Sequence, residues 1–177
     1  MKFCSNCGNQ VTQQIPDGDN RLRFVCNHCN TIHYQNPLVI VGVIPEYKQQ
    51  ILLCKRAIEP QKGRWTLPAG FLENDESTLE GALRECYEEA NANVVDPELY
   101  ALYDIPYINQ VYVFYRAKLA NKEFGPSFES TEVALFSEQD IPWDQLAFPV
   151  VRAALKRYLS DCKNNQFDVI QDTITRK

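Results

Sequence analysis

Four of the seven cysteines stand in two closely spaced pairs. Cys4 and Cys7 form one Cys-x-x-Cys pair, and Cys26 and Cys29 form a second after an interval of eighteen residues. A two-residue spacer in a tight turn allows both sulfurs of a pair to reach one tetrahedral ion at about 2.3 Å. Two such pairs at this separation therefore predict a four-thiolate zinc site.

Disulfide bonds or a redox centre would account for the paired cysteines less well than zinc does. Disulfides require an oxidising compartment, but the total of seven cysteines is odd and the first residues show no apolar segment of a secretion signal. A redox role for one pair would leave the second pair without a role. The remaining cysteines are scattered singly, and we expect all three to be buried thiols that fill the core: Cys54, Cys86 and Cys162.

The residues around the four paired thiols are expected to fold as a small ribbon. Residues 10–15 and 21–25 have strand-like patterns, and the intervening residues 16–20 have the composition of a turn. We therefore assign residues 1–33 to a zinc ribbon and residues 34–37 to a linker. A unit of this size cannot bury a sufficient hydrophobic core, so the metal must supply much of its folding free energy.

The sequence of the ribbon does not define its role, which could be to bind nucleic acid, to form a dimer or to brace a neighbouring domain. Three basic and two acidic side chains give it a net charge of +1 before the metal and thiolates are counted, which is a weak basis for binding nucleic acid. A structural or dimer-forming role is favoured. Four thiolates complete the metal site, so we expect the nearby His28 and His33 at the surface or behind the ligands.

A strongly acidic stretch covers residues 68–98. Nine acidic residues and one base, Arg84, give this stretch a net charge of −8, whereas the whole chain carries −5. The acidic residues are Glu73, Asp75, Glu76, Glu80, Glu85, Glu88, Glu89, Asp96 and Glu98. Such a local excess of carboxylates marks this part of the chain as the place to look for chemistry.

Residues 77–90 are predicted to form a helix within the acidic stretch. The helix begins with a Ser-x-x-Glu capping pattern, and apolar residues recur along it at helical spacing. Glu85, Glu88 and Glu89 fall on one arc of the last two turns, where the helix dipole favours cations and like charges repel. A solvated acidic face is the alternative, but a bound divalent cation would remove these penalties.

The acidic stretch resembles the box of the Nudix hydrolase family, Gly-x5-Glu-x7-Arg-Glu-U-x-Glu-Glu-x-Gly-U, in which U is aliphatic. Gly70, Glu76 and the run of residues 84–92 occupy its positions here. Cys86 replaces an aliphatic residue, and Asn91 stands where the family has Gly. Asn is the non-glycine residue that best adopts the left-handed conformation at a helix end. Neither change touches a ligand, so we expect activity to be kept.

The resemblance implies an α/β fold, the Nudix α/β/α sandwich. We assign it to residues 38–162, followed by a C-terminal tail or edge strand at residues 163–177. The sequence patterns predict β-rich runs at residues 38–44 and 51–57, a long strand at 110–119 and an amphipathic helix at 148–162.

The resemblance also implies metal-dependent hydrolysis of a nucleoside diphosphate linked to another moiety, with Mg²⁺ or Mn²⁺ as cofactor. By position, Arg84 and Glu76 form a salt bridge that holds the catalytic helix, and Glu88 binds metal or orients the attacking water. The metals lower the pKa of that water and neutralise charge on the diphosphate. The implied metal ligands are the Ala69 carbonyl and the side chains of Glu85, Glu88, Glu89 and Glu132.

Two downstream carboxylates are candidates for the general base. Relatives that cleave ADP-ribose often place the base on a loop after the box. Glu129, in a loop that begins with Gly125 and Pro126, is the preferred base. Glu132 begins an alternating strand and resembles a downstream metal ligand. The alternative for each is an acidic side chain on a surface loop.

The substrate implied by the resemblance is ADP-ribose, cleaved to AMP and ribose 5-phosphate, or FAD, cleaved to AMP and FMN. Residues 110–112, 129–133 and 141–149 look like those of zinc-ribbon Nudix enzymes similar to FAD and ADP-ribose pyrophosphatases. Candidate substrate contacts are Arg56, Tyr107, Gln110, Tyr112 and Phe148.

Two alternatives to this activity stay open. NADH pyrophosphatases and RNA-decapping relatives share the ribbon and the box, but carry a Ser-Gln-Pro-Trp-Pro-Phe-Pro run that this sequence lacks. A Nudix-like sensor that binds a nucleotide without cleaving it is the second alternative, and the intact glutamates of the box argue against it.

Composition excludes several classes of protein. With 177 residues, 45% hydrophobic and 23% charged, the chain has the composition of a globular domain with a small appendage. A pI near 5.1 does not favour a polyanion-binding protein, so a nucleic-acid partner is not expected. No apolar run approaches the roughly 20 residues that span a bilayer. We expect a cytoplasmic location, a small nucleotide substrate and, from the resemblance, a homodimer.

Overall fold

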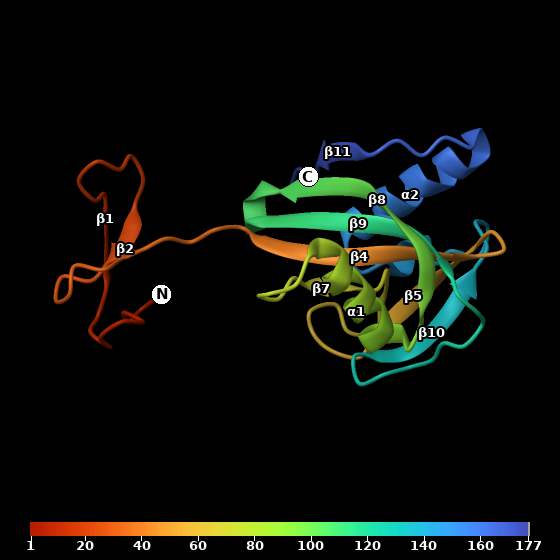
Figure 1. The fold of residues 1–177 in the computed structure, drawn as a ribbon, viewed down its shortest axis with the longest axis horizontal. Helices are drawn as coiled ribbons and strands as arrows, with labels where there is room; N and C mark the ends of the chain where they lie inside the picture. The colour runs from red at the N-terminus through yellow and green to blue at the C-terminus, as the bar shows by residue number, and fades with distance from the viewer. Residues whose placement is uncertain (177) are drawn as a thin grey trace. The chain divides into compact units, whose positions relative to one another are not determined.

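The computed structural model describes residues 1–176, which form two compact units, Met1–Pro37 and the chain from Leu38 onward. Figure 1 shows the elements of both units. Lys177, the last residue of the predicted tail, lies outside the described residues. Within them, no helix is long and apolar enough to cross a membrane.

The first unit is a three-stranded antiparallel sheet. Its strands are β1 (Thr12–Gln14), β2 (Arg23–Val25) and β3 (Ile32–His33), with β2 in the centre. Gly18, in the turn between β1 and β2, has a φ of +81°, a conformation that glycine adopts without strain. The buried apolar residues of this unit are Cys4, Val25 and Cys26. Two of these three carry thiols, so the unit has almost no apolar core of its own.

The second unit is built on an eight-stranded mixed sheet. Its strands are β4 (Leu38–Tyr47), β5 (Gln50–Arg56), β6 (Trp65–Thr66), β7 (Ala69–Phe71), β8 (Val94–Ile105), β9 (Gln110–Leu119), β10 (Ser130–Phe136) and β11 (Ile170–Thr173). The main order is β10-β5-β4-β9-β8-β11, with β6 paired to β5 and β7 paired to β4. The pairs β4–β9 and β8–β11 are parallel, and the others are antiparallel.

Two helices cover opposite faces of this sheet, α1 (Thr78–Ala90) and α2 (Pro149–Asn164). Short 3₁₀ turns lie at η1 (Pro106–Ile108) and η2 (Trp143–Gln145). Along β9, Val113 faces the cluster that contains α1, whereas Phe114 faces the cluster that contains α2. This alternation follows from the period of two in a strand. The unit is therefore an α/β/α sandwich, as the family resemblance implies.

The C-terminal residues form an edge strand. After α2 ends at Asn164, β11 pairs in parallel with β8, and Ile170 lies opposite Ala101. Of the two alternatives that the sequence left open for residues 163–177, the structure shows the edge strand at residues 170–173.

Cys162 was expected in the core, and that prediction is wrong, because its side chain is exposed. In the last turns of α2 the buried stripe runs through Tyr158 and Asp161. The Asp161 carboxylate accepts hydrogen bonds from the Tyr100 hydroxyl at 2.7 Å and from Arg157 Nε at 2.8 Å. These partners satisfy a buried charge, so Asp161 occupies the inward position. Cys54 and Cys86 are fully buried, as expected.

Candidate active site and metal centres

The acidic helix α1 is fixed at both ends by its own sequence. Ser77 is the N-cap, and its hydroxyl accepts a hydrogen bond from the Glu80 N–H while the Glu80 carboxylate accepts one from the Ser77 N–H at 2.8 Å. This confirms the capping box. At the other end, Asn91 has φ 50° and ψ 30°, the left-handed conformation expected of it. The sequence therefore determines where the helix begins and ends, and so where its glutamates lie.

The three glutamates of the last two turns differ in burial. Glu85 and Glu89 are 8% and 4% exposed, whereas the side chain of Glu88 is 53% exposed. Glu89 Oε2 accepts a hydrogen bond from the Ala69 N–H at 3.0 Å. The Glu85 carboxylate lies so close to Gly70 that a Cβ at this position would overlap it. The first glycine of the box is thus required by the close approach of a carboxylate to the backbone of β7.

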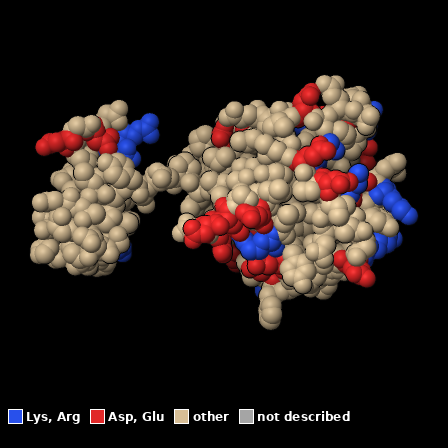
Figure 2. All heavy atoms as spheres, in the orientation of Figure 1, with Lys and Arg blue, Asp and Glu red and all other residues tan. Residues whose placement is uncertain are grey.

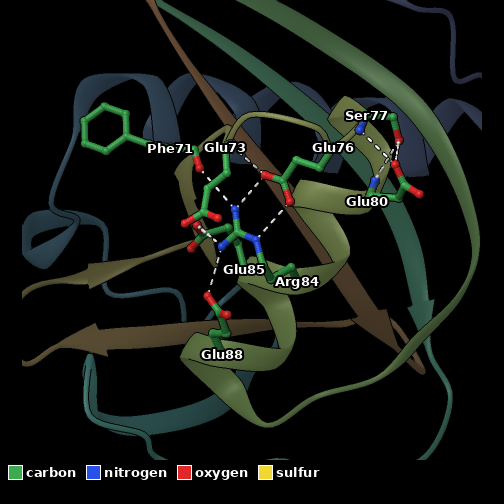
Figure 3. A network of polar contacts seen from close by, with 8 residues as sticks. All are labelled: Phe71, Glu73, Glu76, Ser77, Glu80, Arg84, Glu85 and Glu88. Atoms are coloured by element: carbon green, nitrogen blue, oxygen red, sulfur yellow. Dashed lines mark hydrogen bonds and ion pairs between the residues drawn. The ribbon is translucent and has the colours of Figure 1, made fainter.

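Arg84 links the carboxylates around the helix (Figure 3). Its Nε and Nη2 donate to the Glu76 carboxylate at 3.0 and 2.7 Å in a bidentate pair. Its Nη1 donates to Glu85 at 2.7 Å and to Glu88 at 2.9 Å. The same guanidinium donates to the Phe71 carbonyl at 3.1 Å. The Arg84–Glu76 pair implied by the resemblance is present, and it joins α1 to the segment that precedes it.

The environment shifts the pKa values of the carboxyl groups in opposite directions. The hydrogen bonds from Arg84 lower the pKa of Glu76 to about 2. Burial raises the pKa of Glu85, although the Arg84 hydrogen bond opposes this. Burial, with the nearby charges of Glu85 and Glu129, raises the pKa of Glu89 to about 8. Two buried carboxyl groups whose charged forms are disfavoured lie together, an arrangement typical of functional sites.

The donor set of this site fits a hard divalent cation. Buried carboxylate oxygens beside a backbone turn are the ligands that Mg²⁺ and Mn²⁺ prefer, and a bound cation would favour the ionised forms of Glu85 and Glu89. Arg84 already contacts Glu85, but no cationic group donates to Glu89 within the described residues. A cation would supply that missing charge.

A cavity of about 610 Å³ opens beside these carboxylates. All five predicted substrate contacts line it, namely Arg56, Tyr107, Gln110, Tyr112 and Phe148. Arg56 Nε donates to the Pro60 carbonyl at 2.7 Å, and its guanidinium lies 5.2 Å from the centre of the Phe148 ring. The cavity thus combines carboxylates, a fixed cation and aromatic rings. Figure 2 shows acidic side chains gathered around a basic one on this domain, over β7 and α1.

The two candidate bases lie in different surroundings. Glu129 lines the cavity together with Glu85 and Glu89. Glu132 is not among the lining residues, and its carboxylate accepts a hydrogen bond from Lys55 Nζ at 3.2 Å. The family resemblance implies Glu132 as a metal ligand, but the structure places it outside the cavity, on β10 opposite Lys55 and after a register shift between Ser130 and Glu132. The geometry favours Glu129 and not Glu132 as part of the site.

Backbone groups complete the site, and the sequence does not reveal them. The Phe71 carbonyl accepts from Arg84, and the Glu73 N–H donates to Glu76 at 2.7 Å. Every residue carries a backbone carbonyl, and all but proline carry an N–H, so the residue type does not predict such a contact. The position of these residues between Gly70 and Glu76 of the box is the one available signal.

The four paired cysteines form a second potential metal centre. Their sulfur atoms all lie within 4.8 Å of one another, with Cys4 and Cys29 at 3.6 Å and Cys7 and Cys26 at 3.5 Å. Four thiols at this spacing fit one tetrahedral ion. Within the described residues, no other group of three or more His, Cys, Asp or Glu side chains has its ligand atoms so close together. His33 Nε2 lies 3.2 Å from Cys4 Sγ, behind the ligand set.

An α/β/α sandwich with a glutamate-rich helix beside a cavity defines a class of metal-dependent hydrolase, and comparison with known families agrees. Residues 2–35 match the zinc-ribbon family described as Nudix N-terminal, and residues 36–158 match the NUDIX domain family. The chain belongs to the Nudix hydrolase family.

Several individual proteins are similar to this chain. A solved Nudix hydrolase from Nitrosomonas europaea is 53% identical over 99% of this chain and 100% of its own, with a TM-score of 0.95. A curated relative from Vibrio parahaemolyticus, named NAD-capped RNA hydrolase NudC, is 26% identical over 91% of this chain. The chain spans about 60% of that relative's length. An ADP-ribose pyrophosphatase structure from Streptococcus suis is 22% identical over 78% of this chain and 100% of its own, with a TM-score of 0.62, and shows the fold alone.

The raised pKa of Glu89 predicts how stability depends on pH. Between the ordinary value of 4.5 and about 8, the folded protein holds a proton that the unfolded chain has released. Without a divalent cation, the melting temperature of the second unit is therefore expected to fall as pH rises from 5 to 8. Added Mg²⁺ should restore it at pH 8 and have little effect at pH 5.

Tryptophan fluorescence provides the measurement, because both tryptophans, Trp65 and Trp143, belong to the second unit. A melting temperature that stays constant over this range without Mg²⁺ would contradict the prediction.

Proposed function

We propose that the chain hydrolyses the diphosphate of an ADP-linked compound and releases AMP. The observation that carries this proposal is the cavity itself. It places the carboxylates of Glu85, Glu89 and Glu129 beside Arg56 and the ring of Phe148. Carboxylates can hold a cation that binds diphosphate oxygens, a guanidinium can contact a phosphate, and an aromatic ring can stack on a purine.

Each residue of the site would have its own role in such a reaction. Glu85, Glu89 and the Ala69 carbonyl would hold Mg²⁺ or Mn²⁺. The bound cation would neutralise charge on the diphosphate and lower the pKa of the attacking water. Glu129 would accept a proton from that water as general base. Arg84 would keep Glu85 in place through its short hydrogen bond.

Two observations bear on the identity of the substrate, and they favour different compounds. The curated relatives are named NAD-capped RNA hydrolases, which favours NAD or an NAD-capped RNA end over ADP-ribose and FAD. These names do not support the expectation that nucleic acid is excluded as a partner. The missing Ser-Gln-Pro-Trp-Pro-Phe-Pro run favours ADP-ribose or FAD. All four substrates share the reaction class and differ in the group beyond the diphosphate.

A panel of substrates tests both the reaction and its specificity. The full chain with Mg²⁺ is incubated separately with NAD⁺, NADH, NAD-capped RNA, ADP-ribose and FAD, and the products are separated by chromatography. AMP with nicotinamide mononucleotide identifies NAD as the substrate, whereas nicotinamide mononucleotide with an RNA that carries a 5′-monophosphate identifies NAD-capped RNA. AMP with ribose 5-phosphate or with FMN identifies ADP-ribose or FAD. Thermal stabilisation by a nucleotide without any cleavage would instead identify a sensor and overturn the proposed function.

The ribbon would hold a structural Zn²⁺. The support is the cluster of four thiols with no apolar core around it. Zinc binding through four thiolates stabilises small units of this kind. A homodimer and a cytoplasmic location stay predictions.

A further inference from the structure

Asn91, which stands where the Nudix box has glycine, makes contacts that a glycine could not make. Its side-chain Nδ2 donates to the Pro126 carbonyl at 2.8 Å, and a longer contact of 3.4 Å reaches the Gly125 carbonyl. The shorter distance is that of a good hydrogen bond. Both acceptors belong to the segment that connects β9 to β10, beside α1 in Figure 1.

Backbone hydrogen bonds attach this connecting segment at Gly125 and at Glu129 itself. The Gly125 N–H donates to the Ala90 carbonyl at 2.8 Å, which satisfies a free carbonyl at the end of α1. The Ala57 N–H, in the chain after β5, donates to the backbone carbonyl of Glu129 at 2.8 Å. The backbone of the segment that carries Glu129 is therefore hydrogen-bonded both to the end of α1 and to the chain that follows β5.

We propose that Asn91 is a positioning residue that acts through Glu129. Its side-chain amide holds residues 125–129 against the end of α1 and so keeps the Glu129 carboxylate at the cavity. This inference rests on the proposed role of Glu129 as general base.

The conformation of Asn91 does not by itself require a side chain. Glycine reaches the left-handed region at no steric cost, and the family uses it at this position. Asparagine reaches the same conformation and adds a donor. Pro126 has no N–H, so its carbonyl is its one backbone polar group, and within the described residues Asn91 is the donor that contacts it. The substitution thus adds a connection from α1 to the loop.

Asn91→Gly tests this connection, because it keeps the backbone conformation and removes only the amide. Hydrogen exchange at the amides of residues 121–129 is expected to become faster, while α1 stays protected. The kcat is expected to fall about tenfold, with KM within about twofold, because a displaced base impairs the chemical step and not substrate binding.

Asn165→Gly is the matched control. Asn165 caps α2 in the same conformation, with φ 50° and ψ 40°, and its backbone N–H donates to the Asp161 carbonyl. The same substitution there is expected to leave both loop exchange and kcat unchanged. If glycine at a helix end were destabilising in general, Asn91→Gly and Asn165→Gly would both lower the stability of the protein.

A double-mutant cycle with Glu129→Gln separates this inference from the proposed function. If Asn91 acts through Glu129, Asn91→Gly has no further effect on kcat once Glu129→Gln is present. Unchanged loop exchange in Asn91→Gly, or faster exchange with an unchanged kcat, overturns the positioning role alone. Full activity in Glu129→Gln shows that the assigned base is wrong, and the inference then fails with it.

Discussion

Glu89→Gln is expected to lower kcat with Mg²⁺ by at least about a hundredfold and, at the same time, to make the magnesium-free protein more stable at pH 8. The two effects have one cause. A glutamine has nearly the shape of the glutamate, but it carries no charge. It therefore offers no charge to a cation, and its burial does not desolvate a charge.

The loss of activity follows from the position of this carboxylate. Glu89 is 4% exposed, lines the cavity and accepts a hydrogen bond from the Ala69 N–H beside β7. The glutamine Oε1 can still accept that bond, so the helix and the strand should keep their contact. What disappears is one of two buried negative charges that a divalent cation would bind. Mg²⁺ should therefore no longer raise the melting temperature at pH 8.

The gain in stability follows from the pKa of about 8. At pH 8 the unfolded chain has released this proton almost completely. The folded protein must either hold the proton or bear a buried charge, and either state costs free energy relative to the unfolded chain. Each unit of pKa shift corresponds to about 1.4 kcal/mol. Removing the titrating group should flatten the decline in melting temperature between pH 5 and pH 8.

Glu80→Gln is the control for this prediction. Glu80 lies on the same helix but lines no part of the cavity, and a glutamine preserves the capping box with Ser77. Its kcat should stay within about twofold of wild type. If Glu89→Gln were as active as Glu80→Gln, the assignment of the metal site to α1 would be wrong. Loss of activity together with loss of stability would indicate a folding defect instead.

The parts of this site that could be predicted are those set by neighbours in the sequence. A capping box needs residues three apart, and the left-handed end of α1 needs only the residue Asn91 itself. The two cysteine pairs each close a local turn. In all of these, the partners are a few residues apart, so one stretch of sequence contains the whole interaction.

Features that depend on strand pairing could not be predicted in the same way. The sequence patterns did not predict β8, the longest strand. Its pairing with β9 shifts register between Val95 and Glu98 and again between Leu99 and Ala101. Each shift interrupts the alternation of inward and outward residues on which strand prediction depends. β10 likewise shifts register between Ser130 and Glu132, so simple alternation does not predict the face on which Glu132 lies.

Removal of zinc, or replacement of Cys26 with serine, is expected to unfold residues 1–37 while the chain from Leu38 onward stays folded. The strands of the first unit contain three, three and two residues, and all of β1 is exposed. None of its residues belongs to the hydrophobic clusters of the protein within the described residues. Strands this short are not stable without packing or a metal.

A bound zinc ion would therefore be the main source of stability for this unit. A structural zinc site contributes about 10–16 kcal/mol in comparable small units at neutral pH. Cys26 is fully buried, and its sulfur lies 3.5 Å from that of Cys7. A serine there leaves three thiolates near one another and weakens the binding of the ion that would neutralise them.

Limited proteolysis with a measurement of bound zinc tests this prediction. In Cys26→Ser, or after treatment with a zinc-selective chelator in excess Mg²⁺, protease should digest residues 1–37 and leave a stable fragment that begins near Leu38. Tryptophan fluorescence should be unchanged, because Trp65 and Trp143 both lie in that fragment.

Cys162→Ser provides the matched control, since it makes the same change at an exposed thiol outside the ribbon. It should keep one zinc per chain and resist digestion. If Cys26→Ser lost its zinc and residues 1–37 still resisted protease, the three short strands would be stable by themselves. The small apolar core argues against that outcome, because little in the unit besides a metal would offset the conformational entropy of its ordered residues.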